Sequence, residues 1–569
     1  MSLETERTIG RLWQNATAQE RPRPAYLVEE NGGWREVSWV EAQRAVDELA
    51  NGLLALGVRK GDAFGILAST RLEWVLFDLA LALVGAIGAP VYMASSPRDA
   101  AYVLEHSDAV GVLVEDEEQR EKIAGARLKH VLTFADLDTL RARGREFAAA
   151  QPDALDEAAS AVGEDDLFTY IYTSGTTGPP KACMITQRNY YDMVAVVDKL
   201  GAVVRPDDVM LLYLPLAHNF GRLMHLLSAH VGFTLAFCPD PLRIAEMLPR
   251  VRPTLLPSVP RVYEKLHAAV MAAFDEGSPL KRRIARWALG VGTEVSRRRE
   301  AGARVPPLLA LRNAVADRLV FSKVRKKLGG RFRLGISGGA PLPAEIGRFF
   351  HALGILIVEG YGLTECTSAA TVNRPERFRF GTVGPALPGV ELRIADDGEI
   401  LIRTVTNFAG YYKDEAATRE ILDDEGWLHS GDIGHLDDGF LTVTDRKKDL
   451  IVTAGGKNIP PQNLENALKA SKYISQVLVI GDRRPYVAAL VTLDDAVANG
   501  LSDEEKRARV QEAVDRTNHD RSRFEQIKRF AILPRDFSAE EDEVTPTLKL
   551  KRRVCEEHFA AEIEALYQD

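Results

Sequence analysis

Between residues 40 and 240, segments with a helical spacing of apolar residues alternate with short, continuous apolar runs. Residues 40–56 repeat apolar positions every three or four residues, which predicts an amphipathic helix. Residues 63–67 and 110–114 are short apolar runs of the kind found in buried strands. This alternation predicts an α/β unit whose sheet is at least partly parallel.

The most apolar stretch of the chain covers residues 74–93. Asp78 interrupts it, and Gly85, Gly88 and Pro90 divide it into a helix followed by a strand. We therefore interpret this stretch as a buried part of the core and not as a membrane span.

A second alternation begins near Thr254. A charged helical stretch at residues 280–328 precedes two apolar runs, at 332–336 and 355–358. We therefore expect an α/β fold in which a large N-terminal domain contains two packed α/β units.

After residue 388 the pattern changes to short strands and tight turns. The tripeptide Asp-Asp-Gly occurs at 396–398 and at 437–439, each time between apolar runs, which predicts two hairpins in a small β-rich unit. Residues 445–449 then place five charges in a row, as suits an exposed joint between domains. We predict an N-terminal domain at 1–445 and a small α+β C-terminal domain at 446–569.

Composition and charge exclude several classes of protein. The 72 Lys and Arg residues and 81 Asp and Glu residues give a formal charge of −9, so nucleic acid is not expected as the main partner. The basic runs at 297–299 and 323–327 are interpreted as solvated faces. Four scattered cysteines indicate neither a disulfide framework nor a zinc site, and the acidic N-terminus is unlike a signal peptide. A cytoplasmic location is therefore expected.

The strongest chemical signal is the segment at 170–181, Tyr-Ile-Tyr-Thr-Ser-Gly-Thr-Thr-Gly-Pro-Pro-Lys. Its glycines and small hydroxyl residues let backbone N–H groups turn toward an anion, and Lys181 adds a compact positive charge. The segment therefore predicts a phosphate-binding loop. A Walker loop has Gly-Lys-Ser/Thr directly before a helix, whereas here two prolines separate Gly178 from Lys181 and an apolar strand follows. A P-loop NTPase is therefore disfavoured.

Two further segments predict nucleotide contacts. In residues 359–365, Glu-Gly-Tyr-Gly-Leu-Thr-Glu, the ring of Tyr361 offers a face for stacking on a base. Thr364 offers a hydroxyl to the reacting groups, and Glu365 offers a hard oxygen ligand for Mg²⁺. Residues 337–342, Ser-Gly-Gly-Ala-Pro-Leu, follow an apolar strand, and their small residues allow the backbone to come close to a flat ring.

Segment 170–181 resembles the phosphate loop of the adenylate-forming superfamily, which includes acyl-CoA synthetases, adenylation domains of peptide synthetases and firefly-type luciferases. One departure is Ala182, where the family usually has Gly. Other segments that resemble family motifs follow in the family order along nearly the whole chain, at 214–220, 259–261, 337–342, 359–365, 427–432 and 545–552.

The resemblance implies a role for each matching residue. Lys448 falls at the family hinge, about which the C-terminal domain moves, and Asp432 matches the aspartate that binds the ribose. The implied catalytic residues are Lys549, Thr364 and Lys181, the implied magnesium residues are Thr176 and Glu365, and the implied acyl-pocket residues are His218, Gly338 and Gly360. The implied nucleotide-binding residues are Thr173, Ser174, Gly175, Thr176, Thr177, Gly178, Lys181, Gly338, Gly339, Ala340, Glu359, Gly360, Tyr361, Gly362, Thr364, Asp432, Arg446, Lys448 and Lys549.

The resemblance also implies an activity, that of an acid:CoA ligase using ATP, Mg²⁺ and coenzyme A. A carboxylate would attack the α-phosphorus of ATP, release pyrophosphate and form an acyl-adenylate, and coenzyme A would then take the acyl group and release AMP. The motifs at 259–261, 337–342 and 359–366 favour a long-chain fatty acid.

Two other functions stay open at this point. The acyl group could be delivered to the phosphopantetheine of a carrier protein, or the chain could be a non-catalytic protein that binds an acyl-nucleotide. Because oily acids partition into bilayers, peripheral membrane contact also stays open, and the sequence does not specify an oligomeric state.

Overall fold

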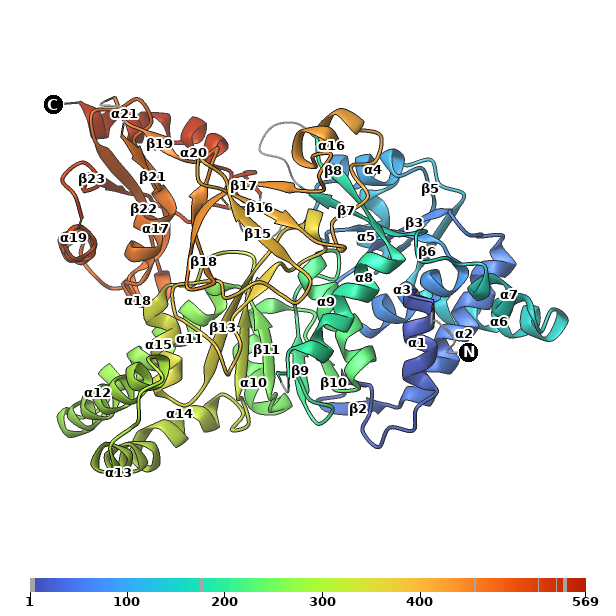
Figure 1. The fold of residues 1–569 in the computed structure, drawn as a ribbon, viewed down its shortest axis with the longest axis horizontal. Coiled ribbons are helices and arrows are strands. Elements are labelled where there is room, and N and C mark those ends of the chain that lie inside the picture. Colours follow the sequence, from blue (N-terminus) through green and yellow to red (C-terminus); the bar gives the residue numbers. More distant parts are fainter. Residues whose placement is uncertain are drawn as a thin grey trace.

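The computed structural model shows a large N-terminal α/β domain followed by a small C-terminal α+β domain (Figure 1). Two extended sheets with their helices and a separate four-stranded sheet build the large domain, so the predicted fold class is confirmed. The structure describes residues 6–173, 179–201, 203–454, 457–519, 521–538, 540–545 and 550–568.

The first sheet has six strands in the order β6-β5-β3-β4-β7-β8. All neighbours are parallel except β8, which is antiparallel to β7. The strands predicted at 63–67 and 110–114 are β3 and β5, and the helix predicted at 40–56 is α2. The elements are α2 Trp39–Leu56, β3 Ala63–Leu67, α3 Leu72–Val84, β4 Ile87–Val91, α4 Pro97–His106, β5 Ala109–Val114, α5 Glu117–Lys122, β6 His130–Thr133, α6 Leu137–Ala150, α7 Ala154–Ser160, β7 Leu167–Thr173 and β8 Lys181–Thr186.

The second sheet has eight strands in the order β14-β13-β12-β11-β9-β10-β1-β2. Only the outermost strands, β14 and β2, pair antiparallel with their neighbours. Its first two strands come from the N-terminal segment, and the apolar pattern did not predict that β1 would pair with the distant β10. The strands are β1 Tyr26–Glu30, β2 Gly33–Val37, β9 Val209–Leu212, β10 Thr234–Phe237, β11 Leu255–Ser258, β12 Leu334–Ser337, β13 Leu356–Tyr361 and β14 Thr371–Val372.

The helices associated with this sheet include a long pair that extends from the body at the lower left of Figure 1. The stretch predicted as helical at 280–328 divides into α12 and a second helical run that begins at α13. Gly302, with φ +64°, and the prolines at 306 and 307 separate the two, because neither residue type suits a helix interior. The helices are α1 Ile9–Thr17, α8 Gln187–Ala195, α9 Asn219–Val231, α10 Ile244–Val251, α11 Pro260–Asp275, α12 Pro279–Glu300, α13 Pro307–Ala316, α14 Ser322–Lys327 and α15 Ala344–Ala352.

Two apolar clusters of described residues lie in the large domain, and the larger one extends from Ile9 in α1 to Leu441 in β18 (Phe440–Arg446). A buried ion pair crosses this cluster. Arg222 of α9 donates from Nε to Asp78 Oδ2 of α3 at 3.0 Å, and from Nη1 to Thr169 Oγ1 of β7 at 2.6 Å. Asp78, which looked like an interruption in an apolar helix, is therefore a core residue with a buried partner.

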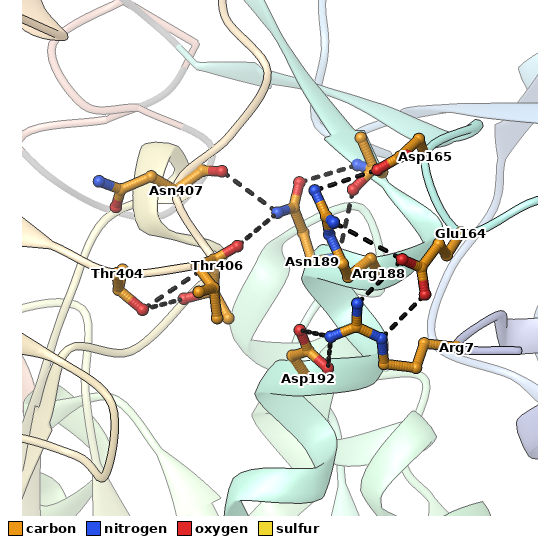
Figure 2. A network of polar contacts seen from close by, with 11 residues as sticks. Arg7, Glu164, Asp165, Arg188, Asn189, Asp192, Thr404, Thr406 and Asn407 are labelled. Carbon is orange, nitrogen blue, oxygen red and sulfur yellow. Dashed lines mark hydrogen bonds and ion pairs between the residues drawn. The ribbon is translucent and has the colours of Figure 1, made fainter. Parts of the chain in front are cut away.

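The four-stranded sheet, β15-β16-β17-β18, contains both predicted Asp-Asp-Gly hairpins. Figure 2 shows how the segment after β16 attaches to α8: Asn189 Nδ2 donates to the carbonyls of Val405 at 3.1 Å and Asn407 at 3.2 Å. Beside it, Arg7 bridges Glu164 and Asp192. The elements are β15 Glu391–Ile394, β16 Glu399–Arg403, α16 Glu415–Ile421, β17 Leu428–Asp437 and β18 Phe440–Arg446.

The small domain is built on the three-stranded sheet β21-β22-β23 and has two apolar clusters, one with α17 and α19 and one with α20 and α21. The continuous apolar runs at 477–480 and 487–493 lie in β21 and β22. No helix among the described residues has the length and apolar character needed to cross a membrane. The elements are β19 Ile451–Val452, β20 Asn458–Ile459, α17 Pro461–Lys469, β21 Ile474–Ile480, β22 Val487–Leu493, α18 Asp495–Ala498, α19 Asp503–Asn518, β23 Ile527–Ile532, α20 Arg552–His558 and α21 Ala560–Tyr567.

Candidate active site

A cavity of about 2630 Å³ lies where the two extended sheets of the large domain, its four-stranded sheet and the small domain meet. The carboxyl ends of β7, β12 and β13 supply part of its wall, as is usual for ligand sites in α/β proteins. Residues of β17 and of the joint after β18 complete the polar part. Described residues that the motifs implied, among them Lys181, Thr364 and Asp432, are thus brought together from distant parts of the sequence.

The predicted phosphate loop connects β7 to β8, so it joins two strands and not a strand to a helix. Ser174, Gly175, Thr176, Thr177 and Gly178 lie outside the described residues, and their predicted roles stay predictions. At the edges of the loop, Thr173 ends β7 and Lys181 begins β8, and both line the cavity.

The ammonium group of Lys181 lies close to two side chains of the segment that follows β16, Asp414 and Tyr411. Its Nζ lies 3.8 Å from Asp414 Oδ2 and 5.1 Å from the centre of the Tyr411 ring. About 40% of the side chain is exposed, so the charge can reach an anion in the cavity. The next residue, Ala182, is fully buried in the apolar cluster formed with α4, and its methyl group packs there.

The segment after β13 also lines the cavity. Thr364 and Glu365 lie in a short 3₁₀ turn, and Glu365 Oε1 accepts a 2.6 Å hydrogen bond from Tyr411 Oη. Gly362 is required by close packing, because a Cβ atom there would lie 2.2 Å from the carbonyl oxygen of Ser368. Gly360 and Thr364 both line the cavity.

The loop after β12 is held against β13 by Glu359. The carboxylate of Glu359 accepts a 2.8 Å hydrogen bond from the backbone N–H of Leu342, and burial raises its pKa to about 8. Gly339 has φ +82°, a conformation that glycine adopts without strain. Gly338, Gly339 and Ala340 consequently present their backbone to the cavity, whereas the Glu359 carboxylate faces the loop.

The carboxylate of Asp432, in β17, contacts two other side chains that line the cavity. Tyr361 Oη donates to Asp432 Oδ2 at 2.7 Å, and Arg446 Nε lies 3.3 Å from Asp432 Oδ1. Lys448 follows in an exposed turn that also lines the cavity. Lys549 lies outside the described residues, so its predicted role stays a prediction.

Apolar side chains line another part of the same cavity, together with His218. His218 is the N-cap of α9, where its Nδ1 accepts from the backbone N–H of Phe220 at 3.1 Å. The apolar side chains that line the cavity here come from α8 to α11 and the segments between them: Met193, Val194, Val197, Leu200, Val203, Val204, Leu223, Met224, Leu227, Ile244, Val262 and Leu266.

Three residues that line the cavity were not predicted from the sequence: Tyr411, Ser475 and Asp536. Tyr411 contacts both Glu365 and Lys181, yet it lies in no motif that we recognised. The small domain contributes Ser475 and Asp536 to the cavity wall, and Arg261, read only as a motif residue, donates to Ser475 Oγ at 2.7 Å. A local pattern carries no signal for such contacts between distant segments.

The donor set fits a magnesium ion that arrives with a nucleotide. Among the described residues no three His, Cys, Asp or Glu side chains converge as a metal site. Mg²⁺ bound to substrate phosphates needs only one or two protein carboxylates, because phosphates and water complete its octahedron. Glu365, which lines the cavity, can supply one of them.

Residues 12–412 match the AMP-binding enzyme family, and residues 448–569 match the AMP-binding enzyme C-terminal domain. The chain therefore belongs to the AMP-binding enzymes, the adenylate-forming superfamily. It is 39% identical to the long-chain-fatty-acid–CoA ligase FadD15 of Mycobacterium bovis, over 96% of this chain and 95% of the relative. It is 32% identical to the long-chain-fatty-acid–CoA ligase ACSBG2 of Xenopus laevis, over 99% of this chain and 84% of the relative.

Solved structures share the fold. The adenylation domain of a carboxylate reductase from Mycobacterium chelonae matches with a TM-score of 0.78 at 22% identity, over 99% of this chain and 91% of that one.

Proposed function

We propose that this protein is an ATP-dependent long-chain fatty acid–CoA ligase that works through an acyl-adenylate. The observation that carries the proposal is the continuity of one cavity, which is lined both by Lys181, Tyr361 and Asp432 and by the apolar side chains of α8 to α11. A nucleotide and an oily acid can therefore meet in one space. The names of the relatives that match over nearly the whole chain support the same substrate class.

In the first half-reaction, the protein positions ATP and the acid and neutralises negative charge as it spreads over the phosphates. Asp432 and Arg446 hold the ribose, and the backbone of residues 338–340 approaches the base beside Tyr361. Lys181 and Lys549 supply positive charge to the phosphates, and Thr364 orients the α-phosphate. Glu365 and Thr176 would hold Mg²⁺ together with the phosphates, and the ion would supply further charge neutralisation.

In the second half-reaction, coenzyme A must reach the acyl-adenylate. We propose that residues 446–569 move as a unit about Lys448, which removes Lys549 from the site and admits the pantetheine thiol. The exposed turn at Lys448, between β18 and β19, suits such a hinge.

The test is pyrophosphate release on mixing the protein with ATP, Mg²⁺ and a series of straight-chain acids. We expect activity to rise with chain length and to be highest at about twelve to eighteen carbons, because each buried methylene contributes about 0.8 kcal/mol. Activity confined to acetate or benzoate would contradict the long-chain assignment, and no release with any acid would favour a non-catalytic binding protein. Coenzyme A and a holo-carrier protein, compared as acceptors, distinguish the two thioester products.

A further inference from the structure

The helical segment at residues 279–328 carries a charge opposite to that of the rest of the chain. It contains fourteen Lys and Arg residues but only three Asp and Glu residues, a formal excess of eleven positive charges in a protein whose formal charge is −9. The three carboxylates are already engaged: Glu294 pairs with Arg298 at 2.8 Å, Glu300 with Arg348 at 3.4 Å and Asp317 with Arg325 at 2.6 Å. The segment therefore presents a strong local cationic field.

The same segment exposes large apolar side chains. On the helical run that begins with α13 and continues through a π-helical turn into α14, four of them recur at spacings of three and four residues, which places them on one face. Their exposed fractions are high, for example 62% for Leu308 and 63% for Leu311. The four residues are Leu308, Leu311, Val315 and Leu319.

Basic residues flank this apolar stripe on the same exposed side. Arg312 lies one turn after Leu308, and Arg318 and Lys323 follow beside Leu319, all of them exposed. We call the set Leu308, Leu311, Val315, Leu319, Arg312, Arg318 and Lys323 the α13 face. On the opposite side of the run, Ala316, Val320 and Val324 are buried.

The neighbouring helix adds to this surface. In α12, which packs against α13 and α15, Leu280 and Trp287 are also exposed. Half of the twelve strongly exposed large apolar side chains found among the described residues lie between positions 280 and 319. Figure 1 shows α12 and α13 extending from the body, so the surface is accessible.

We propose that the α13 face docks the protein on the surface of an anionic phospholipid bilayer. Exposed leucines flanked by arginines and lysines match a membrane interface, where apolar side chains enter the acyl boundary and cations meet lipid phosphates. Nucleic acid would use the basic residues alone and gain nothing from the leucine stripe. Because the rest of the chain is acidic, the remaining surface is repelled by the bilayer, and this face determines the orientation of the bound protein.

The test is flotation of the full chain with vesicles of phosphatidylcholine alone or with about one third phosphatidylglycerol. We expect binding to the anionic vesicles that falls steeply with salt. The triple variant R312Q/R318Q/K323Q should bind about a hundredfold more weakly, at roughly fivefold per charge. The double variant L308S/L311S should bind these vesicles about tenfold more weakly, or weaker still.

Two matched control variants remove basic or apolar side chains from exposed positions outside the α13 face. R120Q/K129Q/R145Q neutralises three exposed basic residues of the six-stranded unit, and V40S/V405S removes two exposed apolar side chains. Both should bind vesicles like the unmodified protein, and all four variants should retain ligase activity on detergent-dispersed acid, because none of the residues lines the cavity.

Three outcomes would overturn the proposal. The first is that the unmodified protein does not bind anionic vesicles. The second is that the control variants lose as much vesicle binding as the α13-face variants. The third is binding that depends on the basic residues but not on the leucines and is matched by heparin or duplex DNA, which would identify a polyanion surface. As a second readout, brominated lipid should quench the tryptophan fluorescence of the unmodified protein more than that of the W287F variant. Equal quenching of the two proteins would place α12 away from the bilayer.

Discussion

Arg261 of the large domain donates a 2.7 Å hydrogen bond from Nη2 to Ser475 Oγ of the small domain. Ser475 is buried and donates in turn to Asp536 Oδ2 at 2.7 Å, so the guanidinium is tied to the interior of the small domain. A second bridge joins Lys472 Nζ to Asp275 Oδ2 at 2.8 Å. Together these contacts stabilise the domain orientation that the structure shows.

Arg261→Ala should change the balance between the two half-reactions. Loss of a hydrogen bond from a charged donor costs about 1.5 kcal/mol, which lowers the population of this orientation by about tenfold. Whichever half-reaction uses this orientation should slow relative to the other. The measurement compares pyrophosphate release with thioester formation from synthetic acyl-adenylate; Lys472→Ala, which removes a more exposed pair, should have a smaller effect. Equal changes in both half-reactions would show that the contact does not select an orientation.

Asp432→Ala should raise the Michaelis constant for ATP more than that for the acid, because the lost hydrogen bonds are to the ribose. Tyr361→Phe keeps the ring but removes the 2.7 Å hydrogen bond to Asp432 Oδ2, so we expect a smaller change in the same direction. Steady-state kinetics with each substrate varied in turn provide the check. An unchanged dependence on ATP in Asp432→Ala would exclude the ribose role.

Lys549→Ala should separate the two half-reactions. Removal of one charged group that stabilises the transition state costs on the order of 10²–10³ in rate, so adenylation should collapse. Thioester formation from synthetic acyl-adenylate should survive if the small domain has carried this lysine away. Lys551→Ala is the matched control, because Lys551 pairs with Asp542 and its loss removes only a partly exposed ion pair. Greater sensitivity at Lys551 would mean that the terminal motif has been assigned in the wrong register.

Glu359→Gln should make stability less dependent on pH. Burial raises the pKa of Glu359 from 4.5 to about 8, so the folded protein keeps this proton after the unfolded chain has lost it. The free energy of unfolding of the unmodified protein should therefore fall as pH rises from 4.5 to about 8, by up to about 1.4 kcal/mol per pH unit. Thermal midpoints at pH 5, 6.5 and 8 give the measurement, with the exposed Glu345→Gln as control. A parallel pH dependence in Glu359→Gln and the unmodified protein would contradict a buried, protonated carboxyl.

Local patterns were sufficient to predict much of this fold. Continuous apolar runs marked β3 and β5, and the two Asp-Asp-Gly turns marked the hairpins of the four-stranded sheet, because such elements depend on neighbours in sequence. The pairing of β1 with β10 and of Asp78 with Arg222 was not predicted, since these partners lie far apart in the chain.

The site was predictable to a similar extent. Motifs identified Lys181, Thr364 and Asp432, which the structure places on one cavity. They gave no indication of Tyr411 or of the contact between Arg261 and Ser475, because each depends on how two domains or units pack. The basic runs at 297–299 and 323–327 were read as solvated faces, and only the structure shows the apolar stripe that lies between them.

The ion pair between Asp78 and Arg222 has a consequence for how the large domain folds. Its two members belong to helices that serve different sheets, so the pair forms only when both sheets and their helices are assembled, and removing one partner from the assembled domain would cost about 3–5 kcal/mol. Neither half is therefore expected to persist as a folded intermediate. Denaturation of the large domain should be cooperative across both sheets, and a fragment that ends between α3 and α9 should not fold on its own.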